Sequence, residues 1–233
     1  MSDPIGTFDH STHFHEAAEE RLLCHKKFLG IFPNGFKDLK YLAWERDHKW
    51  EAHELWHELL SEAEFARLLQ AKEFDEVVRR ALRVESRTNL LFSFEKMALR
   101  DAVRTSDGAR MFALGVYHWL HGKRHVAERF EAFVEVVDAL PRRQTRVLTW
   151  PSVSVFGSIA QPQEHVFLKP QITTLAAKAY GFPFAYTTRP SWATYENLLE
   201  FAAQIKEDLA DLRPRDMIDV QSFIFVLGSP YYA

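Results

Sequence analysis

The spacing of apolar residues predicts helices along most of this chain. From residue 14 to residue 140, apolar residues recur every three or four positions, in segments bounded by glycine, proline or helix-capping residues. No stretch of this part alternates apolar and polar residues as a half-buried strand would. We expect helices at about 14–29, 38–60, 61–69, 73–104, 107–121 and 124–140.

The segment at about 73–104 is predicted to be the central helix. Its first half has one apolar stripe, and in its second half Leu91, Phe94 and Met97 make other faces apolar as well. A helix that is apolar on all faces is buried on all faces. Glu85 and Glu95 fall on or near the stripe, and buried carboxylates need partners. We therefore expect this helix to contain either an ion-pair network or a functional site.

The composition changes after residue 140. Six of the ten prolines lie in the fifty residues from Pro141 to Pro190, so this region must consist of short elements. Two of its apolar runs, at 153–159 and 222–227, fit either a helix or a strand, and we expect the second to belong to a buried final helix. The chain is thus predicted to be all-α, a multi-helix bundle around the central helix with a second, proline-punctuated helical layer. We expect a single domain over residues 1–233, with sub-layers at 14–140 and 147–229.

Composition and charge narrow the functional classes. A hydrophobic content of 47% is typical of a packed globular protein, and a net charge of -3 argues against a surface that is basic overall. The single cysteine, Cys24, excludes an internal disulfide and fits a reducing compartment. The first residues lack a signal peptide, and no apolar run approaches the roughly 20 residues that cross a bilayer. We expect a cytoplasmic protein without a membrane segment.

One motif is typical of metalloenzymes: the five residues from His53 to His57 read HELWH. Histidines one helical turn apart can bind one zinc ion, and the glutamate that follows the first can activate a zinc-bound water. Over these five residues the chain resembles the zincin metallopeptidases, with Glu54 as the catalytic base. A third ligand is needed, and Glu85 and Glu95 are the candidates.

A structural role is the alternative for the same residues. If His53 and His57 face the central helix, they can donate hydrogen bonds directly to Glu85 and Glu95 and hold two helices in register. We favour this alternative, because the third zinc ligand is only inferred. We therefore predict no cofactor, with zinc as the alternative.

A basic patch could contact nucleic acid. Arg142, Arg143 and Arg146 follow the proline that ends a predicted helix and precede Trp150, with polar donors between them. Arginine and polar side chains in this arrangement can bind phosphates of DNA or RNA. No helix-turn-helix, zinc-finger or RNA-recognition motif accompanies the patch. The alternative is a solvated helix face that pairs with acidic neighbours.

Four stretches carry a resemblance to other proteins. They are 87–96 (RTNLLFSFEK), 149–151 (TWP), 167–170 (FLKP) and 214–223 (PRDMIDVQSF). Together they resemble a set of uncharacterised bacterial proteins of about this length, which implies no activity. The order of FLKP, a helix with Trp192 and Tyr195, and a final apolar helix is also similar to helical modules attached to restriction and DNA-repair proteins. That second resemblance implies a link to nucleic acid.

These observations leave three hypotheses open. The first is a binding or accessory module, associated with DNA or RNA through Arg142, Arg143 and Arg146. The second is a zinc-dependent hydrolase centred on His53 and His57. The third is a structural partner of another protein. The sequence predicts neither the ligand nor the oligomeric state.

Overall fold

The computed structural model describes residues 10–141 and 146–232, and every regular element in this part of the chain is a helix. The all-α prediction is therefore confirmed. Among the described helices, none combines the length and the apolar character that crossing a bilayer requires. The α-helices are α1 His10–Ile31, α2 Leu39–Tyr41, α3 Asp47–Leu60, α4 Glu62–Gln70, α5 Phe74–Glu85, α6 Ser93–Ala102, α7 Ser106–His121, α8 Val126–Ala139, α9 Trp150–Ala160, α10 Pro170–Ala179, α11 Trp192–Asp208 and α12 Met217–Gly228. Short 3₁₀ turns lie at Gly35–Lys37, Ala210–Leu212 and Pro230–Tyr232, and a π-helical turn lies at Leu42–Arg46.

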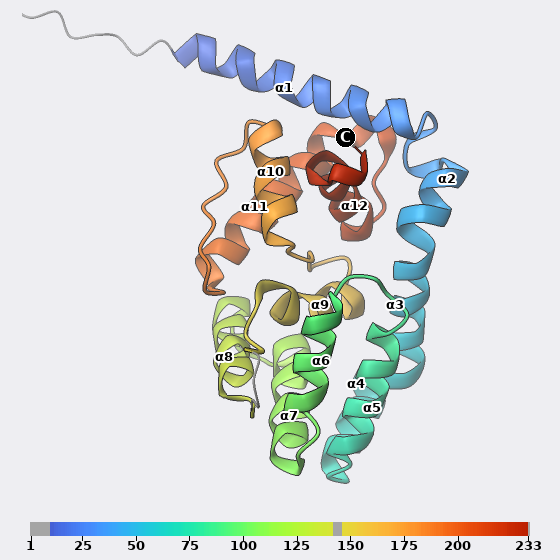
Figure 1. Ribbon diagram of the computed structural model, residues 1–233, viewed down its shortest axis with the longest axis vertical. Coiled ribbons are helices and arrows are strands. Elements are labelled where there is room, and N and C mark those ends of the chain that lie inside the picture. The colour runs from blue at the N-terminus through green and yellow to red at the C-terminus, as the bar shows by residue number, and fades with distance from the viewer. Residues whose placement is uncertain (1–9, 142–145, 233) are drawn as a thin grey trace, which may run out of the picture.

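The helix at the centre is α9, not the one predicted. Every residue of α9 except Ser158 is buried, and the helix packs against α3, α5, α6, α7 and α8. In Figure 1, α9 lies in the middle of the molecule, above α6 and α7 and below α10 and α12. Thr149 accepts a hydrogen bond from the Ser152 backbone N–H and so caps α9, and Pro151 occupies its first turn, where no backbone N–H is needed. The ambiguous run at 153–159 is therefore a helix.

The long helix predicted at about 73–104 is wrong, because the chain breaks between α5 and α6. The Thr88 hydroxyl donates to the Glu85 carbonyl, and the Phe92 backbone N–H donates to the Glu95 carboxylate, which caps α6. Such local side-chain bonds compete with helix continuation. The break turns Phe94 and Met97, which were predicted to be buried, toward solvent, and they are 54% and 62% exposed.

A π-helical turn interrupts the helix predicted at 38–60. The predicted segment is helical, but the wider turn at Leu42–Arg46 inserts one extra residue relative to an α-helix. Leu39, which precedes the turn, is 82% exposed. Beyond the turn, the buried positions are Lys49, Ala52, Trp56 and Leu60. His57 lies outside this buried set and is exposed.

The final helix is buried, as predicted, and the run at 222–227 lies inside it. Asp216 accepts hydrogen bonds from the Ile218 and Asp219 backbone N–H groups and so caps α12. The helix packs most extensively against α10 and also contacts α1 and α11. At Gly228 a Cβ atom would lie 2.0 Å from the Ile172 carbonyl oxygen, so glycine allows the α12 backbone to approach α10.

Candidate functional site

The HELWH motif lies on α3, and its two histidine rings lie 4.6 Å apart, but no third metal ligand joins them among the described residues. His53 is half-buried, and its Nδ1 lies 2.8 Å from the Ile159 carbonyl oxygen of α9. A carbonyl oxygen only accepts, so His53 Nδ1 donates this bond. Burial lowers the pKa of His53 below its usual value, which favours the neutral ring. Glu54 and His57 are exposed.

The two candidate carboxylates have other partners. Glu85, at the end of α5, is buried and lies 3.0 Å from the Lys96 ammonium. Glu95 caps α6 and also accepts a hydrogen bond from the Thr149 hydroxyl at 3.4 Å. Burial raises the pKa of both carboxyl groups.

The predicted zinc site is therefore not assembled in this structure. Within residues 10–141 and 146–232, no three His, Cys, Asp or Glu side chains lie close enough together to hold a metal ion. The hydrogen bond that the favoured alternative expects is not formed by His53, which donates to a backbone carbonyl instead of a carboxylate. Both predictions relied on an uninterrupted helical register, which the π-helical turn and the break after Glu85 remove.

The predicted nucleic-acid patch lies mostly outside the described residues. Arg142 and Arg143 lie outside the described residues. Arg146, just before α9, is exposed. Contact of these three arginines with DNA or RNA stays a prediction.

A cleft between the 86–92 loop, α10 and α12 adjoins the buried charged side chains of Glu45 and Lys49. Its volume is about 580 Å³. Lys49 and Gln221 lie at its base, Lys169 and Phe92 on its wall, and Tyr231 at its mouth. We call this the Lys169 cleft. Its lining includes two lysines and one glutamate, Glu45, so one positive charge is in excess.

Lys49 is held at the base of the cleft by two hydrogen bonds. Its ammonium donates to Glu45 at 3.2 Å and to the Ser222 hydroxyl of α12 at 2.9 Å. Burial lowers the pKa of Lys49, and the charge of Lys169 lowers it further, whereas Glu45 raises it. The second oxygen of Glu45 accepts a hydrogen bond from the Tyr232 hydroxyl at 2.6 Å. The charge of Lys49 is thus already balanced within the protein.

Lys169 differs from Lys49 because its charge is not paired. Its ammonium lies 4.1 Å from the centre of the Phe92 ring and 5.7 Å from that of Phe225. Among the residues that the structure describes, no carboxylate lies within ion-pair distance of it. Burial lowers the pKa of Lys169, and the more distant charges of Glu95 and Glu45 oppose that shift. The cleft therefore presents a half-buried cation between aromatic faces.

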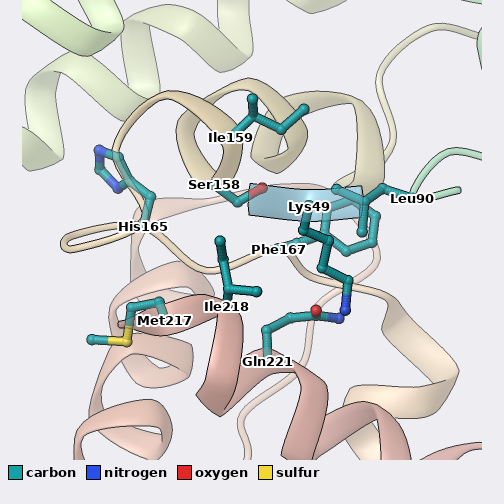
Figure 2. A pocket seen from close by; sticks show the side chains of 9 residues that line it. All are labelled: Lys49, Leu90, Ser158, Ile159, His165, Phe167, Met217, Ile218 and Gln221. Carbon is teal, nitrogen blue, oxygen red and sulfur yellow. The ribbon is translucent and has the colours of Figure 1, made fainter. Parts of the chain in front are cut away.

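A small inner chamber adjoins the cleft and shares Lys49 and Gln221 with it. Its volume of about 20 Å³ is enough for a single water molecule. Figure 2 shows Lys49 and Gln221 on one side of the chamber and His165 on the other, with the His165 ring turned away from the rest. That ring packs on Trp119, with 4.5 Å between ring centres. The chamber extends the polar base of the cleft toward the core.

Residues far apart in the sequence form this cleft. Three of the four stretches that carry the bacterial resemblance meet there, through Asn89 and Phe92, Lys169, and Gln221. Lys49 was not predicted, because a lysine within a helical segment is usually exposed, whereas this one is only 7% exposed. A sequence signal for Lys169 existed: this lysine lies between an apolar pair and Pro170, which begins α10.

Comparison with known proteins adds no functional information. No protein-family model, no curated protein and no solved structure matches this chain. A function is therefore inferred from the residues that line the Lys169 cleft.

Proposed function

We propose that this protein binds a nucleotide-like ligand, a flat ring that carries an anionic group, in the Lys169 cleft. The single observation that carries the proposal is the half-buried ammonium of Lys169, which lies against Phe92 and has no carboxylate partner in the described chain. A desolvated, unpaired cation is costly, and an anion that replaces the missing partner relieves that cost.

The other residues that line the cleft support the proposal that the ligand contains a flat ring. Phe92 and Phe94 are 50% and 54% exposed and stack in a nearly parallel orientation, so the pair offers partly exposed aromatic surface beside Lys169. Asn89, Gln171 and Gln221 contribute amide groups, which can both donate to and accept from the edge of a base. A volume of about 580 Å³ lies within the usual range for small-molecule sites.

Isothermal titration calorimetry with nucleoside monophosphates, the matching nucleosides and inorganic phosphate tests this function. We expect a nucleotide to bind about tenfold or more tightly than its nucleoside, because a hydrogen bond to a charged group contributes about 1.5–3 kcal/mol. We also expect inorganic phosphate to bind more weakly, because it has no ring to stack. Absence of binding by every nucleotide at millimolar concentration would overturn the proposal.

Lys169→Gln should weaken nucleotide binding about tenfold or more, because it removes the only unpaired cation among the described lining residues. The matched control is Lys178→Gln, which removes an exposed lysine from α10, outside the cleft. Circular dichroism of both variants verifies that they fold. Equal affinities of the two variants would contradict the role of Lys169.

The affinity for a nucleotide should also depend on pH. Because burial lowers the pKa of Lys169, its ammonium loses the proton at a lower pH than an ordinary lysine does. The affinity for the nucleotide should therefore fall as the pH rises through this lowered pKa. Titrations between pH 7 and pH 10 measure the effect, which should be absent in Lys169→Gln.

A further inference from the structure

A second cavity lies on the outer surface of α7 and α8, away from the Lys169 cleft. These two helices are joined by a short turn and lie side by side at the lower edge of Figure 1. They pack closely at Gly115, where a Cβ atom would lie 2.7 Å from Val136 Cγ1. Along the seam between them runs a groove of about 620 Å³, which we call the α7/α8 groove.

The floor of the groove is apolar and only partly covered. Met111 and Leu114 of α7 and Val136 of α8 are half-buried, and Ala132 is exposed. These positions repeat at three or four residues along each helix, which is the spacing that a third helix contacts. Phe133 in the lining is buried, whereas the ring of His118 is exposed.

The rim of the groove is basic at both ends. Arg110 lies at one end, Lys123 and Arg124 lie at the other, and all three are exposed. None of them forms an ion pair with an acidic side chain in the described ranges 10–141 and 146–232. Arg129 donates to the carbonyl oxygens of Trp119 and Leu120, so no carboxylate neutralises its charge. Glu128 is the single acidic residue among the described lining residues.

We propose that the α7/α8 groove binds an amphipathic helix of a partner protein, with acidic residues on both sides of the helix's apolar face. The apolar floor fits the apolar face of such a helix, and the basic rim fits the acidic flanks. From Arg110 to His121 the groove follows α7 for about 16 Å, which corresponds to about three turns of a docked helix. A nucleic acid fits less well, because its phosphates would lie over the apolar floor.

A synthetic peptide tests the proposal on the full-length protein. The probe is a fluorescein-labelled helix of about 18 residues, with leucine along one face and glutamate on both flanks. The comparison peptide has lysine in place of every glutamate. Fluorescence anisotropy should show the acidic peptide binding at least about tenfold more tightly than the basic one. No binding of the acidic peptide, or equal binding of the two, overturns the proposal.

Two variants locate the binding and exclude the other occupants. Leu114→Gln, in the floor, and Lys123→Gln/Arg124→Gln, at the rim, should each weaken the acidic peptide about tenfold. Lys37→Gln/Lys178→Gln removes two exposed lysines elsewhere and should leave the affinity unchanged. Loss of binding in the rim variant but not in Leu114→Gln overturns the helix assignment. Binding of a single-stranded oligonucleotide that only the rim variant abolishes overturns it in favour of nucleic acid.

Discussion

Asp219→Asn is expected to destabilise the folded protein by about 3–5 kcal/mol, the usual cost of removing one partner from a buried ion pair. Asp219 is fully buried at the start of α12. It accepts hydrogen bonds from the Tyr41 hydroxyl at 2.6 Å, from Arg46 at 2.9 Å and from the Arg215 guanidinium at 2.8 and 2.9 Å. Urea or guanidinium unfolding measures the effect.

The large effect follows from the balance of charges around Asp219. Arg46 forms a second, bidentate pair with Asp216, and both of its partners are on the helix that it faces. Burial alone would raise the pKa of Asp219, but hydrogen bonds from Arg215 and Tyr41 and the charge of Arg46 hold it below its usual value. The cluster consists of two cations (Arg46, Arg215) and two carboxylates (Asp216, Asp219), which are linked by ion pairs, while Lys49 and Glu45 form a separate pair. The asparagine variant leaves one positive charge in excess.

The matched control is Asp211→Asn. Asp211 also forms an ion pair, with His25, but its side chain is 61% exposed, so the change should cost less than about 1 kcal/mol. Adding Arg46→Met to Asp219→Asn should cost less than the sum of the two single changes, because the two side chains contact each other. A change of less than about 1 kcal/mol in Asp219→Asn itself would mean that the cluster does not stabilise the fold.

Local sequence signals were sufficient to predict several helices and the all-α class. Asp216, placed just before the apolar run of the last helix, predicted the start of α12 because an N-terminal cap is a local interaction. The helices α7 and α8 were predicted for the same reason, since their apolar stripes and end residues lie within one segment. The all-α class follows from such local patterns.

The predicted helices were wrong where one periodic pattern of apolar residues was extended across a local change in the backbone. A stripe projected from Leu39 to Leu60 assumes 3.6 residues in every turn, and the π-helical turn at Leu42–Arg46 breaks that assumption. In the structure Lys49 is buried and His57 is exposed. The same kind of error joined α5 to α6, although Thr88 and Glu95 are typical of a chain that stops and restarts a helix.

Acidification should destabilise the native protein more than the variant His165→Phe. His165 is 2% exposed, and burial lowers its pKa from 6.5 to about 4, with a further contribution from the Arg129 charge. Between those two pH values the unfolded chain binds a proton at this residue and the folded protein does not. The free energy of unfolding should therefore fall as the pH drops from 6.5 to 4, by about 3 kcal/mol from this histidine alone.

The variant is chosen so that little besides the titration changes. The Nδ1 atom of His165 lies 3.4 Å from the Tyr195 hydroxyl, and its Nε2 atom has no hydrogen-bond partner among the described residues. In His165→Phe the Tyr195 hydroxyl keeps its bond to the Val166 carbonyl, and the new ring can pack on Trp119. Glu85 and Glu95, whose raised pKa values make stability change in the opposite direction with pH, are present in both proteins. The difference between the two curves therefore isolates His165.

Urea unfolding at several pH values from 7 to 4.5 measures this difference. The stability of the native protein should approach or fall below that of His165→Phe as the pH decreases, whatever the two values are at pH 7. The control His118→Gln removes an exposed histidine from α7 and should leave the slope of the native curve unchanged. Parallel curves for the native protein and His165→Phe would mean that His165 can be protonated in the fold, which its packing against Trp119 and its proximity to Arg129 argue against.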